Sequence, residues 1–287
     1  MTSYANPDSL VETDWLQRRL DDPAVAIVEV DEDTSAYDTS HIPGAVSINW
    51  RTELHDQPRR EFISTEQLAD LLGAKGISDE QTIVLYGGNN NWFAAYGFWL
   101  CRLRGTGDVR LLNGGRKKWE LEDRPMTADR PPVAPRSYTM RDQNLELRAL
   151  RDEVMADVQD GRRIRFVDVR SPEEYRGEKL APPHLPQEQA QVPGHIPGAI
   201  NVPWSSAAND DGTFKSAEEL RTLYTGQGVG ADDEIVAYCR IGERSSHTWF
   251  VLKELLGFAK VRNYDGSWTE YGSLVGAPVE RSEVTIS

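Results

Sequence analysis

The strongest candidate for chemistry in this sequence is Cys239. It follows the strand-like segment EIVAY (234–238) and precedes a segment with the apolar spacing of a helix. A cysteine at the carboxyl end of a buried strand, facing a helix start, lies where open α/β sheets place reactive groups. Backbone N–H groups and the helix dipole favour a thiolate there, and Arg240 and Arg244 add positive charge. Cysteines in such settings titrate at roughly pH 3.5–7.5. We therefore expect Cys239 to have a lowered pKa and to act as a nucleophile.

The other cysteine, Cys101, lies in an apolar run of helical spacing, FAAYGFWLCRL (93–103). A free cysteine in such a run usually behaves as a small buried hydrophobe. We therefore expect Cys101 to pack in a core and to take no part in chemistry.

The composition limits the classes of protein to consider. With 287 residues, 39% hydrophobic and 27% charged, the chain has the length of one large domain or two ordinary ones. Its net charge of −14 argues against a nucleic-acid partner, because phosphate binding needs a basic face. Gly97 and Arg102 interrupt the longest apolar run, so we expect no membrane span. The N-terminus lacks a signal-peptide pattern and only two cysteines occur, so we expect a reducing cytoplasm.

The chain contains an internal repeat. Three pairs of segments recur in the same order: HIPGAVSINW (41–50) with HIPGAINVPW (195–204), STEQLADLLGAKGI (64–77) with SAEELRTLYTGQGV (216–229), and TIVLY (82–86) with EIVAY (234–238). Both members of the second pair begin with the capping-box pattern of a helix start. The alternation of strand and helix in each half is typical of a parallel sheet with helices on both faces.

We therefore predict an α/β fold of two tandem domains. The first covers residues 1–124 and the second residues 145–287, and the proline-rich stretch between them, 125–144, is predicted to be an extended linker on the surface. At the position of Cys239, the first half has Gly87, in the loop GGNNNW. Since glycine has no nucleophile, only the second domain can carry out cysteine chemistry.

With these motifs the chain resembles the two-domain rhodaneses, which are thiosulfate sulfurtransferases, and most closely their actinobacterial members. The resemblance covers nearly the whole chain. It includes both HIPGA motifs, the DVR-x3-EYRG segment (168–177), the loop CRIGERS (239–245) and the closing DGSW (265–268). It implies two rhodanese-like domains, an inactive first and an active second, with a site at their interface and a covalent persulfide on Cys239.

The mechanism that follows is a double displacement. The Cys239 thiolate attacks the outer sulfur of thiosulfate, releases sulfite, and passes the persulfide sulfur to cyanide or a thiol. The loop N–H groups are expected to hold the persulfide's negative charge. The substrate-binding candidates are the six residues after the cysteine, Arg240, Ile241, Gly242, Glu243, Arg244 and Ser245. Asp168 and Arg170 are candidates for supporting the loop from behind. No metal or organic cofactor is expected, because neither cysteine belongs to a metal-binding cluster.

The loop also bears on the sulfur donor. Family members that use thiosulfate resemble CRKGVT here, and those that use 3-mercaptopyruvate resemble CGSGVT. This chain keeps Arg240 and Gly242, has Ile241 in place of the lysine, and supplies a second cation with Arg244. Two arginines suit a dianion, so we expect thiosulfate as the donor, with 3-mercaptopyruvate as the alternative. Glu243 is expected to be solvated or structural.

We also make predictions for Glu174, for the two HIPGA histidines and for one insertion. Animal rhodaneses place a donor-binding arginine where this chain has Glu174, so that contact is not expected. His41 and His195 recur in both halves and should be structural. The insertion at 181–194, which contains His184, is a candidate for overhanging the site.

Two other functions stay open. Cysteine-based tyrosine phosphatases wrap a phosphoryl group with C-x5-R, whereas the C-x4-R loop from Cys239 to Arg244 is one residue shorter and fits a single bound sulfur better. The third possibility is a binding or sensing module that carries sulfur without rapid turnover.

Overall fold

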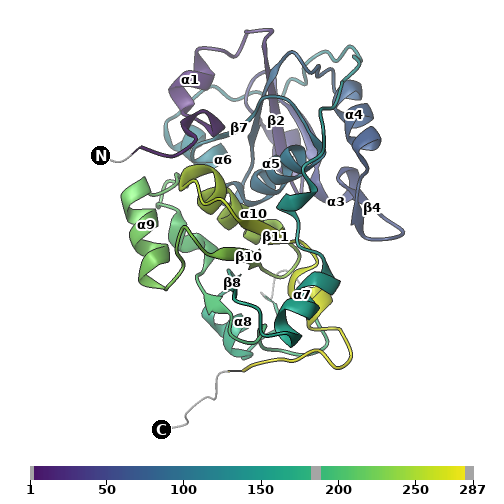
Figure 1. The fold of residues 1–287 in the computed structure, drawn as a ribbon. Helices are drawn as coiled ribbons and strands as arrows, with labels where there is room; N and C mark the ends of the chain where they lie inside the picture. The colour runs from purple at the N-terminus through teal and green to yellow at the C-terminus, as the bar shows by residue number, and fades with distance from the viewer. Residues whose placement is uncertain (1–2, 182–188, 282–287) are drawn as a thin grey trace. The chain divides into compact units, whose positions relative to one another are not determined.

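The computed structural model describes residues 3–181 and 189–281, and the chain divides into two compact units. We call Pro7–Leu145 with Ala208–Phe214 the N-terminal unit, and Glu146–Ala207 with Lys215–Ser287 and Met1–Asn6 the C-terminal unit. Each contains a parallel sheet flanked by helices (Figure 1). The predicted α/β fold with two similar domains is confirmed.

The sheet of the N-terminal unit is parallel, in the order β1-β7-β6-β2-β3. Its strands are β1 (Leu10–Val11), β2 (Val25–Asp31), β3 (Val46–Asn49), β6 (Thr82–Tyr86) and β7 (Val109–Leu112); β4 (His55–Asp56) and β5 (Glu61–Phe62) form a separate antiparallel pair. The helices are α1 (Thr13–Gln17), α2 (Ser35–Thr39), α3 (Trp50–Glu53), α4 (Thr65–Ala74), α5 (Trp92–Arg104) and α6 (Gly115–Leu121), with short 3-10 turns at Pro7–Ser9 and Asn89–Asn91. The run from Ile83 to Tyr86 is buried throughout, as expected for a strand covered on both faces.

The sheet of the C-terminal unit is also parallel, in the order β11-β10-β8-β9. Its strands are β8 (Ile164–Asp168), β9 (Ile200–Asn201), β10 (Glu234–Tyr238) and β11 (Val261–Tyr264). The helices are α7 (Arg151–Gln159), α8 (Pro172–Arg176), α9 (Ala217–Gly226), α10 (Glu243–Phe250) and α11 (Ser267–Tyr271), with 3-10 turns at Leu145–Leu147 and Trp204–Ala207. A π-helical turn, Val251–Leu255, continues α10, and the N–H groups of Ala5 and Asn6 bond to carbonyls at its end.

The proline-rich stretch forms no helix or strand from residue 128 to residue 144. Its backbone is instead hydrogen-bonded to the N-terminal unit: the Arg136 N–H donates to the Gly73 carbonyl over 2.9 Å, and the Arg141 N–H to the Gly105 carbonyl over 2.7 Å. A Cβ at Gly73 would lie 2.3 Å from the Arg136 carbonyl oxygen, so the close approach requires glycine there. The stretch is extended and belongs to the N-terminal unit, and its role as a linker between domains stays a prediction.

Both units repeat the same buried contact between a central strand and the HIPGA turn. The hydroxyl of Tyr86 accepts the N–H of Ile42 over 3.1 Å, and the hydroxyl of Tyr238 accepts the N–H of Ile196 over 3.1 Å. These tyrosines are the last residues of β6 and β10. Each HIPGA turn is thereby attached to the end of the strand that precedes the loop beginning at Gly87 or at Cys239.

The histidines of the two HIPGA motifs also have matching environments. The ring of His41 stacks on Tyr37 and its Nδ1 lies 2.8 Å from the Tyr37 carbonyl; His195 stacks on Tyr175, with Nδ1 2.7 Å from that carbonyl. The arrangement is the same in both units, which fits the structural role predicted for these histidines.

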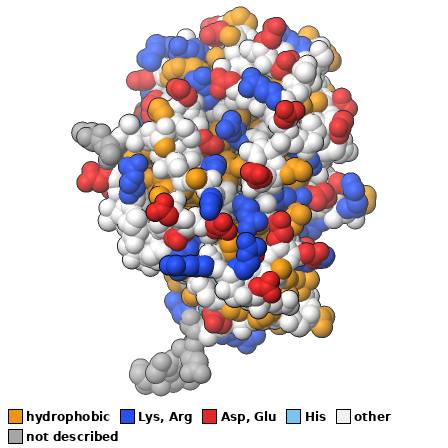
Figure 2. Space-filling view, in the orientation of Figure 1, with side chains coloured by type: hydrophobic (Ala, Val, Ile, Leu, Met, Phe, Trp, Pro, Cys, Tyr) orange, Lys and Arg blue, Asp and Glu red, His pale blue; other side chains and the backbone are white. Residues whose placement is uncertain are grey.

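The face seen in Figure 2 carries acidic and basic side chains interspersed with each other. Within the described ranges, no helix is both long and apolar enough to cross a membrane.

Replacing Tyr238 by Phe leaves the buried Ile196 N–H without its acceptor. We expect the free energy of unfolding to fall by about 1–3 kcal/mol, and the same for Tyr86→Phe through Ile42. Urea denaturation of the full chain measures this. The control is Tyr4→Phe, whose partly buried hydroxyl donates to the Lys215 carbonyl and should matter less. Equal stability of all three variants and the parent chain would contradict the role given to these hydroxyls.

Candidate active site

Cys239 directly follows β10, the strand that lies between β8 and β11. The loop ends at Gly242, and α10 begins at Glu243. Gly242 has a φ of 98°, and a Cβ there would lie 2.8 Å from the Cα of Asp265. The tight loop therefore requires glycine at this position, and it brings the first turn of α10 back to the sulfur.

The sulfur of Cys239 is buried among polar groups. The Gly242 N–H donates to Sγ over 3.1 Å, and the thiol donates to Oε2 of Glu243 over 3.2 Å. The Cys239 N–H donates to Oγ of Ser267 over 3.0 Å, and that hydroxyl donates to the Tyr264 carbonyl over 2.7 Å. Backbone and side chain of the cysteine are both held in one orientation.

Burial raises the pKa of the Cys239 thiol above its ordinary value, and the negative charge of Glu243 raises this pKa further. The guanidinium of Arg244 and the N–H groups of Ser245 and Ile241 act in the opposite direction without cancelling the rise. The predicted lowering of the pKa is therefore wrong for the sulfur-free protein, because a carboxylate lies beside a sulfur that is shielded from water. At neutral pH the residue is a thiol whose hydrogen is directed at that carboxylate.

The side chain of Arg244 is tied to Glu174 from α8. Its Nη1 donates to Oε2 over 2.9 Å and its Nη2 to Oε1 over 3.1 Å, and both side chains are buried. Burial raises the pKa of Glu174, but the charge and hydrogen bonds of Arg244 outweigh it and lower that pKa below its usual value. The Ser171 cap of α8 fixes Glu174 on the first helical turn. Part of the positive charge that the sequence assigns to the loop is therefore engaged by Glu174.

The other predicted loop residues mainly support the loop. The Arg240 carbonyl accepts the Thr269 N–H over 3.0 Å, and both Arg240 and Ile241 are buried. The Ser245 hydroxyl donates to Oδ1 of Asn263 over 2.6 Å, and Asn263 donates to the Gly242 carbonyl over 3.3 Å. Asn263 and Ser267 were not among the predicted residues, since they come from β11 and α11, far along the chain.

Asp168 and Arg170 form a fully buried ion pair at the end of β8. Arg170 also donates to the Gly194 carbonyl over 2.7 Å, and its guanidinium lies 4.8 Å from the centre of the Trp268 ring. Trp268 in turn donates its backbone N–H to the Cys239 carbonyl over 3.1 Å. The pair thus reaches the loop through Trp268.

The N-terminal unit has an equivalent pair, built from different positions. Glu29 in β2 bonds to Arg116 in α6 over 3.0 Å, and Arg116 also donates to the Ser40 carbonyl. A buried pair that recurs in the unit without a nucleophile indicates a structural role, so a supporting position for Asp168 and Arg170 fits these contacts.

The N-terminal loop is closed to cysteine chemistry by its backbone. A Cβ at Gly87 would lie 2.5 Å from the Val30 carbonyl oxygen. The Gly87 N–H donates to Oδ1 of Asn91 over 2.9 Å, and the Asn91 amide donates to the Leu112 carbonyl over 2.6 Å. Asn89, Asn90 and Asn91 all have positive φ, a region that asparagine tolerates better than most residues. These contacts make the loop a structural turn.

His247 lies one turn after Glu243 in α10 and is fully buried. Its ring packs edge-on against Trp204, with the ring centres 5.2 Å apart. Burial lowers the pKa of His247 to about 3, so the imidazole is uncharged at neutral pH.

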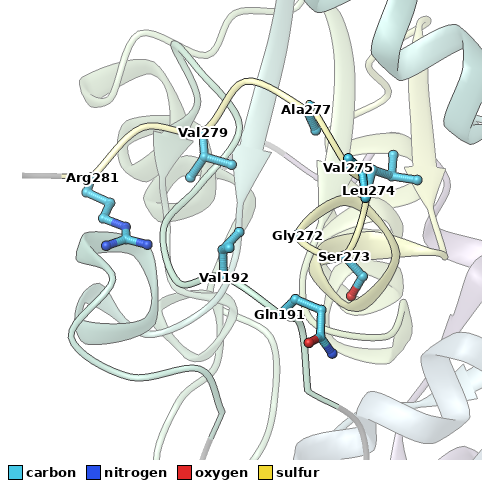
Figure 3. A pocket seen from close by; sticks show the side chains of 10 residues that line it. Gln191, Val192, Gly272, Ser273, Leu274, Val275, Ala277, Val279 and Arg281 are labelled. Carbon is cyan, nitrogen blue, oxygen red and sulfur yellow. The ribbon is translucent and has the colours of Figure 1, made fainter.

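A separate pocket of about 660 Å³ opens in the C-terminal unit, lined by residues 191–192 and 272–281 (Figure 3). None of the predicted site residues lines it. Gln191 and Val192 come from the insertion at 181–194, whose residues 182–188, including His184, lie outside the described residues. Val192 accepts the indole N–H of Trp268 over 3.0 Å, so the described end of the insertion packs behind Trp268.

A family model described as "Rhodanese-like domain" matches residues 12–122 and again residues 150–274. The chain belongs to the rhodanese family. Its two units thus correspond to two copies of one domain, as the internal repeat indicates.

Rhodanese relatives match over nearly the whole chain. One from Mycolicibacterium smegmatis, named "Putative thiosulfate sulfurtransferase", is 60% identical over 276 residues, covering 96% of this chain and 99% of the relative. One from Thermus thermophilus, named "Sulfur carrier protein TtuD", is 54% identical over 283 residues, covering 98% and 99%. The solved structure of the anaerobic ergothioneine biosynthesis enzyme from Chlorobium limicola superposes with a TM-score of 0.85 at 23% identity, covering 99% of this chain and 72% of that one. This last likeness concerns the fold alone.

Replacing Glu174 by Gln leaves the charge of Arg244 buried and uncompensated. We expect the free energy of unfolding to fall by about 3–5 kcal/mol. The pKa of Cys239 should fall as well, because the freed positive charge favours a thiolate. Urea denaturation and the ultraviolet absorbance of the thiolate against pH, both in a Cys101→Ser background, measure the two effects. The control is Glu173→Gln, since the side chain of the neighbouring Glu173 is about half exposed and lies 3.6 Å from Lys179. Identical behaviour of the two variants would contradict the pairing described here.

Proposed function

We propose that this rhodanese is a sulfurtransferase that takes a sulfane sulfur from thiosulfate onto Cys239 and passes it to cyanide or a thiol. The observation that carries the proposal is the position of Sγ, at the end of β10 with the Gly242 N–H donating to it over 3.1 Å. The duplicated loop has Gly87 at this position, so the two units differ at the reacting atom itself.

The reaction consists of two displacements at sulfur. In the first, the Cys239 sulfur attacks the outer sulfur of thiosulfate, and sulfite leaves with the electron pair of the broken S–S bond. In the second, the acceptor attacks the outer sulfur of the persulfide and regenerates the cysteine. The loop N–H groups of Ile241, Gly242 and Ser245, directed at the sulfur, stabilise the persulfide anion.

We propose an N-terminal domain without a nucleophile (1–124), a linker (125–144) and a catalytic domain (145–287). The substrate-binding role given to residues 240–245 belongs to the same proposal. Thiosulfate remains the proposed donor, supported by the names of the relatives and by Arg240 in the loop. Because Glu174 already neutralises Arg244, the charge argument for a dianion is weaker than the sequence indicates, and 3-mercaptopyruvate is the competing donor. A reducing cytoplasm suits a chain whose two cysteines are free thiols.

A second candidate function is that of a sulfur carrier, which holds the persulfide for one protein acceptor. The relative named "Sulfur carrier protein TtuD" favours it, and so does a sulfur buried in a loop of polar groups. A carrier would keep its persulfide in the presence of small thiols and lose it to its protein partner. An enzyme of the proposed kind would lose it rapidly to both.

Cys239→Ser should abolish sulfite release from thiosulfate, because the attacking atom is lost. Cys101→Ser should leave it unchanged, because Cys101 is buried in α5, where burial raises the pKa of its thiol to about 11. Sulfite release and intact mass measure this: the Cys101→Ser protein should gain one sulfur atom with thiosulfate and lose it with cyanide. Equal loss in both variants, or in neither, would refute the assignment. A higher kcat/KM for 3-mercaptopyruvate than for thiosulfate would overturn the donor alone.

A further inference from the structure

The carboxylate of Glu243 is only 1% exposed, although it carries a charge and comes directly after the loop. Its Oε2 accepts the Cys239 thiol over 3.2 Å, and its Oε1 lies 3.6 Å from Nε of Arg244. The outer nitrogens of Arg244 are engaged by Glu174. A buried carboxyl group is costly unless it is paired or has a chemical use, so the position of Glu243 beside a thiol needs an explanation. Of the two roles expected from the sequence, solvated or structural, the burial of Glu243 contradicts the solvated one.

The internal repeat provides a comparison for this residue. When Tyr86 is matched with Tyr238, Gly87 stands at the position of Cys239 and Asn91 at the position of Glu243. In the N-terminal unit the Asn91 amide bonds to the Gly87 backbone and to the Leu112 carbonyl, which is a structural contact. The unit without a nucleophile thus has a neutral amide, and the unit with one has a carboxylate at hydrogen-bond distance from it. The carboxylate occurs together with the thiol.

We propose that Glu243 is the base that accepts the proton of Cys239 and retains it while the sulfur is loaded, an inference that rests on the sulfur-transfer function proposed above. The S–H bond of Cys239 breaks and its proton moves to Oε2. The electron pair left on Sγ forms a bond to the outer sulfur of thiosulfate, and sulfite leaves with the pair of the broken S–S bond. The products are a persulfide anion on Cys239 and a neutral Glu243.

This proton transfer keeps the charge of the buried loop constant. Before loading the negative charge is on Glu243, and afterwards it is on the persulfide. A thiolate formed beside an ionised Glu243 would instead place two negative charges together in a site shielded from water, which is costly. The pKa of Cys239 is raised for the same reason, since burial and the charge of Glu243 both oppose a thiolate. The thiol therefore holds its proton until a base removes it.

The other charged and titratable groups near the pair leave Glu243 as the acceptor. Arg240 and Arg244 are cations, and Glu174 is held ionised by Arg244 on the side away from the sulfur contact. Asp265, whose backbone lies against Gly242, is bonded to Arg148 over 2.8 Å. His247, further along α10, packs on Trp204. In the described part of the chain, the Cys239 thiol donates its hydrogen bond to Glu243.

The test is Glu243→Gln in a Cys101→Ser background, with two readouts against pH: single-turnover sulfite release and alkylation of Cys239 by iodoacetamide. We expect both rates at neutral pH to fall by roughly 10²–10³-fold, within the range of general-base effects. Both should then rise with pH and approach those of the parent chain in the alkaline range, where hydroxide removes the proton. The control is Glu254→Gln, a buried carboxylate in the π-helical turn after α10 that bonds to Asn6, and it should keep the parent profile.

Faster alkylation of the Gln variant at neutral pH would contradict the proposal. If Glu243 acts only as a negative neighbour that raises the pKa of the thiol, Gln at this position speeds alkylation at neutral pH, and the proposal is wrong. Glu243→Asp serves if the Gln variant does not fold: it keeps the charge but withdraws it from Sγ, and should show the same slow neutral and normal alkaline rates. Alkylation does not involve thiosulfate, so it tests the role of Glu243 as a base even if the parent chain releases no sulfite. The absence of sulfite release would refute only the proposed sulfur transfer.

Discussion

The structure of the C-terminal site depends on placing one negative charge in a loop that water does not reach. The sulfur of Cys239 lies at the end of β10, and the positive φ of Gly242 turns the chain sharply enough to aim N–H groups at it. Such a loop stabilises an anion, but it also makes a second anion costly. Glu174 and Arg244 form a buried ion pair, and Glu243 and Cys239 share a hydrogen bond beside it.

The duplicated unit shows which parts of this arrangement belong to the scaffold. Both units attach the HIPGA turn through a tyrosine hydroxyl, and both pair an acidic residue of the strand before it with an arginine. They differ in the loop itself, where Gly87 leaves no room for a Cβ and Asn91 closes the turn with its amide. The fold therefore needs the turn and the buried pair in both units, and the chemistry depends on the few residues between strand and helix.

Much of this follows from the sequence, because the relevant signals are local or repeated. The internal repeat predicts two α/β domains, the capping patterns at Ser64 and Ser216 mark helix starts that the structure contains, and the strand-end position singles out Cys239. The electrostatics of the loop did not follow. A count of nearby arginines takes no account of Glu174, which lies 70 residues before its partner Arg244.

The direction of a side chain is also invisible in a sequence. Glu243 reads as a helix-start residue that favours solvent, yet the backbone of the loop turns it inward against the sulfur. Asn263 and Ser267 support the loop from a strand and a helix far along the chain, and no spacing rule connects them to it. Residues whose roles depend on such long-range contacts need coordinates.

The most direct test of proton transfer from Cys239 to Glu243 is the infrared difference spectrum of the Cys101→Ser chain before and after loading with thiosulfate. We expect a protonated carboxyl band to appear as the persulfide forms, and this band to be missing when Glu243 is replaced by Gln. Formation of the persulfide without any new carboxyl band would show that the proton of Cys239 leaves by another route.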